Sequence, residues 1–155
     1  MLVPPARRAV LTALVALPLV AACSDDGGGT TPLPVALAGT YGLLEVNNRS
    51  LPITLNLIDR QSGATIRATF SAGTLTLDGS GTFVLTLVVA LSGQQPATRA
   101  DTGTYEASGT QLTFRSVRAG QTAGTHSGNE ITVTMPTDLD GDGDTDVALD
   151  LLLSK

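Results

Sequence analysis

The chain is poor in the side chains that usually carry catalysis, with one cysteine and one histidine in 155 residues. The histidine, His126, lies beside a turn, where a surface or hydrogen-bonded role is more typical than that of a general base. Ser127 cannot serve as its nucleophile, because adjacent strand residues point to opposite faces. The sequence also contains no zinc-ligand cluster, phosphate-binding glycine loop or nucleophile elbow. We therefore expect no catalytic residues and a protein that is not an enzyme.

Aromatic residues and positive charges are also scarce. There are three Phe, two Tyr and no Trp, so the core must consist mostly of Leu, Val and Ile. Residues 1–22 contain two arginines and no acids, and without them the net charge changes from −5 to −7. An acidic chain without a basic stripe lacks the charges that neutralise phosphates. This composition excludes nucleic acid as a partner.

The N-terminal residues have the pattern of an export signal. Arg7 and Arg8 precede residues 9–20, an apolar segment in which only Thr12 is polar. A membrane-spanning helix needs about 20 apolar residues, so this segment is too short to span and suits a signal peptide. The sequence therefore predicts a signal peptide over residues 1–22, followed by an exported part.

The exported part is expected to begin at Cys23. The run LVAAC at residues 19–23 resembles the lipobox of bacterial lipoproteins, whose cysteine is lipidated and becomes the first residue. The resemblance implies covalent lipid on Cys23 and a membrane anchor, since two or more acyl chains hold a protein stably. It also leaves no thiol for a disulfide, and Ser24 resembles the default signal for the outer membrane of the cell envelope. The alternative is an ordinary cleaved signal peptide with a free thiol.

Residues 23–34 and residues 35–155 differ in composition. The first segment contains two aspartates, three consecutive glycines and two prolines, and it is expected to be a flexible tether. After it, apolar residues alternate with polar ones, as in ITLNL at 53–57 and ITVTM at 131–135. This period of two is typical of strands with one buried face, and short glycine-bearing turns separate the runs. Residues 35–155 are therefore expected to fold as one β domain.

Ten segments carry the strand signal and predict an all-β fold. They lie near residues 38–46, 53–59, 64–70, 73–78, 82–91, 101–106, 110–116, 121–126, 130–136 and 146–153. Short strands at regular spacing favour an antiparallel up-and-down barrel of eight to ten strands, with a β-sandwich as the alternative. Residues 83–91 are almost continuously apolar, which predicts a strand buried on both faces or one that covers an apolar cavity. A helix is considered only near residues 50–60.

Several short motifs in the domain resemble the small lipocalin-like domains of bacterial lipoproteins. They are AGTYGLLEVNNRSLP at 38–52, GTLTLDGSGTFVLTL at 73–87, DTGTYEASGTQLTF at 101–114 and SGNEITVTM at 127–135. The resemblance implies a lipocalin-like up-and-down barrel, with Gly39-Thr40-Tyr41 at the place of the lipocalin glycine-x-tryptophan. Such a barrel can hold a small apolar ligand, or its interior can be filled by side chains.

The most distinctive motif is the acidic run DLDGDGDTD at residues 138–146. It fits the spacing D-x-D-x-D-G-x-x-D, in which carboxylates turn inward around one calcium ion. An EF-hand would need a glutamate at the twelfth position, where this chain has Leu149. The run instead resembles the calcium loops in β-hairpins of integrin-type propeller repeats. The ligands that this resemblance implies are the side chains of Asp138, Asp140, Asp142 and Asp146 and the backbone carbonyl of Asp144.

Calcium in this loop would be a structural staple for the final hairpin rather than a catalyst. The alternative is a solvated acidic loop that binds nothing tightly. Taken together, the sequence predicts a membrane-anchored envelope lipoprotein with a non-catalytic, lipocalin-like domain that could bind a small apolar ligand. The alternative is a structural or protein-interaction lipoprotein with a filled core and no small ligand. The sequence indicates neither ligand-binding residues nor a protein partner.

Overall fold

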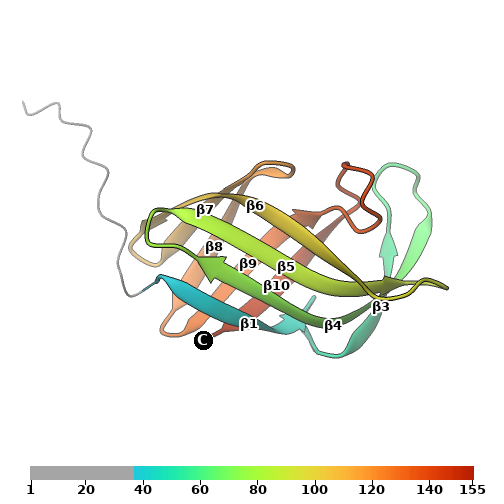
Figure 1. Ribbon diagram of the computed structural model, residues 1–155, viewed down its shortest axis with the longest axis horizontal. Helices are drawn as coiled ribbons and strands as arrows, with labels where there is room; N and C mark the ends of the chain where they lie inside the picture. The colour runs from blue at the N-terminus through green and yellow to red at the C-terminus, as the bar shows by residue number, and fades with distance from the viewer. Residues whose placement is uncertain (1–36) are drawn as a thin grey trace, which may run out of the picture. The chain divides into compact units, whose positions relative to one another are not determined.

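The computed structural model describes residues 37–155, and all of the regular structure in this range is β. Ten strands are joined by turns and loops (Figure 1). They are β1 (Gly39–Val46), β2 (Arg49–Ser50), β3 (Ile53–Ile58), β4 (Thr65–Leu77), β5 (Thr82–Leu91), β6 (Ala97–Ser108), β7 (Gln111–Ser116), β8 (Gly120–Ser127), β9 (Glu130–Thr137) and β10 (Val147–Ser154). The predicted signal peptide, the tether and Cys23 lie outside the described residues.

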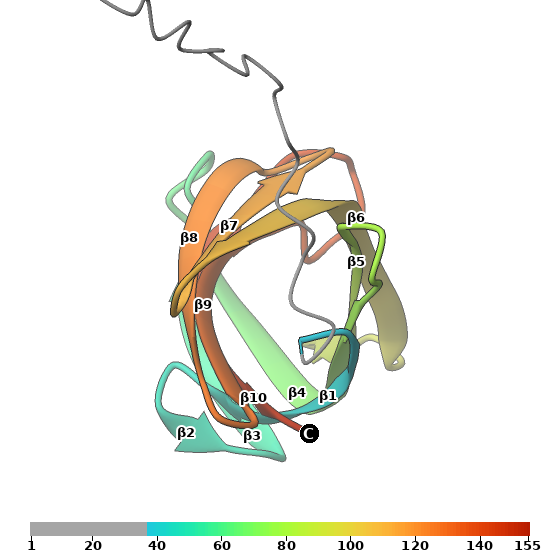
Figure 2. The ribbon, with the colours of Figure 1, turned by 90° about the vertical axis from the view of Figure 1, so that its left-hand side faces the viewer.

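The strands form one antiparallel sheet that closes on itself. From β4 to β10 each strand pairs with the next one in the chain, and β1 pairs with both β10 and β4. Eight strands, β1 and β4 to β10, therefore make a closed up-and-down barrel, while β2 and β3 extend the sheet beside the ring (Figure 2). The predicted all-β, up-and-down barrel is confirmed. The β-sandwich alternative is wrong, because one ring of strands replaces two packed sheets.

The longest strand, β4, replaces two of the predicted strands. Its first half pairs with β3 and its second half pairs with β1, so one continuous strand serves two neighbours. The register with β5 shifts between Phe70 and Ala72, and such a bulge bends a strand and increases its twist. The glycine-bearing signal at residues 71–73 therefore marks a bend in one strand rather than a turn between two.

Residues 50–60 form no helix. They contain the end of β2, a cis peptide bond between Leu51 and Pro52, and β3. Leu55 and Leu57 are buried and alternate with exposed neighbours, which is the burial pattern of a strand with one face on the core. Two other features differ from the prediction: the sequence does not predict the short strand β2, and β6 begins at Ala97 rather than near residue 101.

Side chains fill the ring of strands from the inside. All five aromatic residues of the chain lie in this core, each no more than 2% exposed: Tyr41, Phe70, Phe83, Tyr105 and Phe114. The Phe83 and Phe114 rings meet edge to face, with centroids 5.3 Å apart, an arrangement that aromatic pairs favour.

The strand β5 shows the alternation expected of a barrel wall. Leu85 and Leu87 point inward and are 3% and 1% exposed, whereas the outward Val84 is 42% exposed. The prediction that residues 83–91 are buried on both faces is therefore wrong. The continuous apolar run reflects valines on the outer wall as well as leucines in the core.

The two ends of the barrel carry different connections. The first described residues and the C-terminus share one end, which we call the terminal end, and Lys155 Nζ donates there to the Ala38 carbonyl at 2.9 Å (Figure 1). The opposite end, which we call the mouth, carries the β3–β4, β7–β8 and β9–β10 connections. Two of these connections are joined where the Arg60 amide donates to the Asp146 carbonyl at 2.8 Å. The mouth is thus where the predicted calcium loop, residues 138–146, contacts other parts of the barrel.

Candidate functional site

Residues 138–146, which we call the acidic loop, connect β9 to β10 at the mouth. Thr137 and Val147 are the last pair of the β9–β10 ladder, and the Asp146 amide donates to the Thr137 carbonyl at 3.0 Å. Gly141 and Gly143 have φ values of 90° and 104°, which L side chains rarely adopt. Glycine at these two positions lets the loop reverse direction between the strands.

Three of the five aspartates in the acidic loop converge. Asp138, Asp140 and Asp146 each offer a carboxylate oxygen, and these oxygens lie within 4.8 Å of one another. Oxygens that share a calcium ion at about 2.3–2.6 Å can be at most about 5 Å apart, so this spacing fits one ion. Asp142 and Asp144 are exposed and stand outside this group. The structure therefore contains a three-aspartate cluster that could hold a metal ion, and it brings together three of the five predicted residues.

Two members of the cluster are buried, with Asp138 8% and Asp146 4% exposed. Asp146 Oδ2 accepts hydrogen bonds from the amides of Leu139 at 2.7 Å and Asp140 at 3.3 Å. Burial raises the pKa of the Asp146 carboxyl, and the Asp140 and Asp59 carboxylates add to the rise, while the two amides oppose it. A cation among the three carboxylates would stabilise their charged forms.

Two arginines from other parts of the barrel hold the acidic loop. Arg118, between β7 and β8, forms an ion pair with Asp138, with Nη1 2.9 Å from Oδ2. Arg99, on β6, donates from Nε to the Leu139 carbonyl at 2.7 Å and from Nη2 to the Asp140 carbonyl at 2.8 Å. Sequence reasoning missed both arginines, because each is at least 20 residues from its partner and no local pattern marks it. Hydrogen bonds and an ion pair from these two arginines therefore fasten the acidic loop to the barrel wall.

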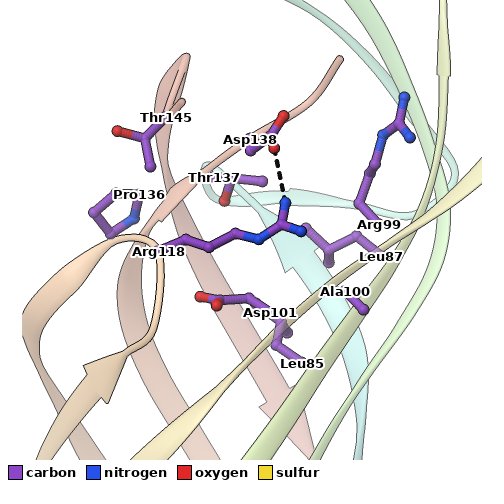
Figure 3. A pocket seen from close by; sticks show the side chains of 10 residues that line it. All are labelled: Leu85, Leu87, Arg99, Ala100, Asp101, Arg118, Pro136, Thr137, Asp138 and Thr145. Carbon is purple, nitrogen blue, oxygen red and sulfur yellow. Dashed lines mark hydrogen bonds and ion pairs between the residues drawn. The ribbon is translucent and has the colours of Figure 1, made fainter. Parts of the chain in front are cut away.

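A small cavity lies at the mouth, next to this cross-link (Figure 3). The apolar Leu85 and Leu87 line it together with the charged Arg99, Asp101 and Arg118. Its volume is about 20 Å³, which is room for roughly one water molecule. The apolar cavity considered beside residues 83–91 is thus no larger than a solvent molecule.

A larger hollow lies elsewhere, on the wall formed by β7, β8 and β9. It measures about 220 Å³ and is an open groove over Gly124, flanked by short side chains such as Ala123 and Thr125. A groove open to solvent does not enclose a ligand in the way that small-molecule sites do.

The lone histidine lies away from the acidic loop. His126 Nε2 is 2.8 Å from the Gly109 carbonyl oxygen, which is the hydrogen-bonded role that its place beside a turn predicts. Among the residues described, no helix is both long and apolar enough to cross a membrane.

Comparisons of this chain with protein-family models, with curated proteins and with solved structures found no match. Three features of the chain itself therefore bear on its function: the acidic loop, the packed barrel interior and the lipobox-like motif near the N-terminus.

Proposed function

We propose that this chain is an envelope lipoprotein, anchored through lipid on Cys23, whose barrel is a non-catalytic structural or protein-interaction module. The observation that supports this best is the filled interior of the ring. The cavity at the mouth has about 20 Å³, whereas sites for small molecules typically enclose about 300–1,000 Å³. A carrier of a small apolar ligand would need the packed leucine and aromatic side chains to move apart, which would cost the free energy of their burial.

Native mass spectrometry tests the filled-core proposal directly. The protein is the chain without residues 1–22 and with Cys23→Ser, so that no lipid is attached. We expect the mass of the polypeptide alone, and a co-purified apolar molecule would instead favour the carrier alternative. Leu87→Ala is the positive control, because removing a buried side chain beside the cavity creates an enclosed apolar space that can take up a small apolar probe.

The anchor rests on the LVAAC motif at residues 19–23 and not on the described residues. Lipid on Cys23 would hold the barrel at a membrane, and Ser24 favours the outer membrane. We expect the full chain in the membrane fraction of an expressing bacterium and the Cys23→Ser variant in the soluble fraction. A Cys23→Ser protein that remains in the membrane fraction would remove the basis for the anchor.

We also propose that the acidic loop binds one calcium ion, with Asp138, Asp140 and Asp146 as its carboxylate ligands. The spacing of their oxygens supports this, and so does the raised pKa of Asp146, which reflects buried negative charge with too little compensation. Calcium takes six to eight oxygen ligands, so further oxygens from the loop or from water must complete the shell. The bound ion would neutralise the cluster and fasten the loop between β9 and β10.

A further inference from the structure

One carboxylate oxygen at the mouth is buried without a partner. Asp101 Oδ1 accepts from the Ser116 hydroxyl and from the Thr102 amide, each at 2.8 Å. Asp101 Oδ2 is shielded from solvent and accepts no hydrogen bond in this arrangement. A shielded carboxylate oxygen without a donor is unfavourable, so an unsatisfied one in a folded protein calls for a donor.

Arg118 is placed to be that donor. Ser116 Oγ accepts the Arg118 amide at 3.0 Å and donates to Asp101, so one hydroxyl links the two residues. Both side chains line the same cavity, and the Asp101 carboxylate lies beneath the extended Arg118 side chain (Figure 3). The Arg118 side chain is 51% exposed, so it can change rotamer without disturbing the core.

Arg118 therefore has two carboxylates within its range, the buried Asp138 and the half-buried Asp101 with its shielded Oδ2. It now pairs with Asp138, whose side chain is 5% exposed, and it leaves Asp101 Oδ2 unsatisfied. A divalent cation at the three-aspartate cluster would neutralise Asp138 and repel the guanidinium beside it. The same movement would bring the guanidinium to Asp101 Oδ2, the shielded carboxylate oxygen that still needs a donor.

We propose that Arg118 is an exchangeable counter-ion, which pairs with Asp138 in the cation-free protein and moves to Asp101 when a divalent cation binds the acidic loop. This inference rests on the proposed calcium site and adds a regulatory role to it. Through this exchange, cation binding at the acidic loop would change the ion pairing of Asp101 on β6, beside the cavity at the mouth. Asp101 and Arg118 are then positioning residues that set the affinity for calcium without touching the ion.

A double-mutant cycle on calcium affinity tests the exchange. Calcium binding is measured by isothermal titration calorimetry on the chain without residues 1–22 and with Cys23→Ser, alone and with Asp101→Asn, Arg118→Gln or both. Gln keeps a donor for Asp138 but removes the charge. Glu106→Gln is the matched control, because it removes one negative charge from the same strand at an exposed site, paired only with Arg115 at 3.7 Å.

We expect Asp101→Asn to weaken calcium binding about threefold to tenfold, because the displaced guanidinium loses its second carboxylate. Arg118→Gln should strengthen binding, because no positive charge then competes with the ion for Asp138. In the Arg118→Gln background, Asp101→Asn should have little further effect, and Glu106→Gln should have little effect in either background.

An equal effect of Asp101→Asn in both backgrounds would overturn the exchange, because it would mean that Asp101 acts by long-range charge or is satisfied by a water molecule. Failure of the unsubstituted protein to bind calcium would overturn the exchange and the proposed calcium site together. Calcium binding that is indifferent to Asp101→Asn would overturn the exchange alone. The Arg118 Nε–H resonance gives an independent readout that needs no arginine variant. Its position in saturating calcium is expected to differ between the unsubstituted protein and Asp101→Asn, because only the first offers the displaced guanidinium a second carboxylate.

Discussion

Lys155, the last residue of the chain, lies over the ring of Tyr41, near the start of the domain, with Nζ 5.1 Å from the ring centroid. The same ammonium group donates to the Ala38 carbonyl at 2.9 Å. Lys155 is therefore tied to the first described residues at the terminal end of the barrel. Tyr41 is itself fixed, because its hydroxyl donates to the Leu37 carbonyl at 2.8 Å.

Removing the ammonium group of Lys155 is expected to lower the free energy of unfolding by about 0.5–1 kcal/mol, the usual range for a cation–π contact made by a solvent-exposed cation. The variant is Lys155→Met, which keeps the length of the side chain, and the measurement is urea denaturation. Lys155→Arg is the control, because it keeps a cation that can lie over Tyr41. Identical midpoints for the Met variant and the unsubstituted protein would show that this contact adds nothing to stability.

Calcium is expected to stabilise the barrel against heat. At free calcium about 100 times its Kd, binding to the folded state alone adds about 2.7 kcal/mol, which raises the melting temperature by several degrees. Melting curves in calcium and in chelator measure this difference. Matching curves in the two conditions would count against the calcium site.

Two aspartate variants locate the site. Asp146→Asn removes a buried carboxylate of the three-aspartate cluster and should abolish the rise in melting temperature with calcium. Asp142→Asn makes the same chemical change at an exposed position outside the cluster and should preserve most of the rise. Equal loss in both variants would favour the five-residue ligand set over the three-residue one.

The close approach of β6 to β7 depends on glycine at position 103. A Cβ added there would lie 2.0 Å from the Arg115 carbonyl oxygen and 2.8 Å from the Phe83 ring. The carbonyl belongs to the backbone of a paired strand and cannot move aside cheaply. Gly103→Ala is therefore expected to lower the free energy of unfolding by about 1–3 kcal/mol or more. That range is typical of overpacking in a core.

Gly79→Ala is the control for this prediction, since a Cβ at Gly79 meets nothing within 4 Å. We expect its stability to be unchanged within about 0.5 kcal/mol, the usual range for surface substitutions. Chemical denaturation of the two alanine variants provides the comparison. A Gly103→Ala protein as stable as Gly79→Ala would mean that β6 and β7 can separate without loss.

Tyr105 predicts that the stability of the barrel depends on pH in the alkaline range. Burial raises the pKa of the Tyr105 phenol, and the nearby Tyr41 phenol and Asp78 carboxylate add to the rise. Its hydroxyl donates to the Asp78 carbonyl at 3.0 Å. The neutral form is therefore favoured in the fold, so its contribution to stability is complete below the unfolded pKa of about 10 and is lost as the pH rises through the higher folded value.

Tyrosinate absorbance separates this effect from other alkaline titrations. In the Tyr41→Phe variant Tyr105 is the remaining tyrosine, and we expect it to ionise above pH 10 in the folded protein. The melting temperature of Tyr105→Phe should fall less between pH 9 and about 11 than that of Tyr41→Phe. Ionisation of Tyr105 at the pKa of a free tyrosine would contradict the prediction.

The barrel could be predicted from sequence because alternation is a local signal. Leu55 and Leu57 in β3, or Ile131 and Val133 in β9, reveal their buried face within five residues. The small residues at 71–73 predict a turn, but the structure has a bulge there. Small residues and glycine occur in both turns and bulges, and only the pairing with β5 distinguishes the two.

The site was only partly predictable for the opposite reason. The spacing of the acidic run identified Asp138, Asp140 and Asp146, since all three are on one short loop. Arg99 and Arg118 reach that loop across the mouth from β6 and from the β7–β8 turn, and no local pattern encodes contacts between residues 20 to 40 positions apart.

Ring closure also determines when the protein can fold. Gly42 of β1 pairs with Ser154 of β10, so the contact that completes the barrel joins residues about 110 positions apart, and folding rates fall as such long-range contacts dominate. The meander from β5 to β10 can form as each hairpin emerges from the ribosome, but β1 lacks its partner β10 until Val147–Ser154 has been made. The ring is therefore expected to remain open until β10 has been made, so closure of the barrel comes late in folding.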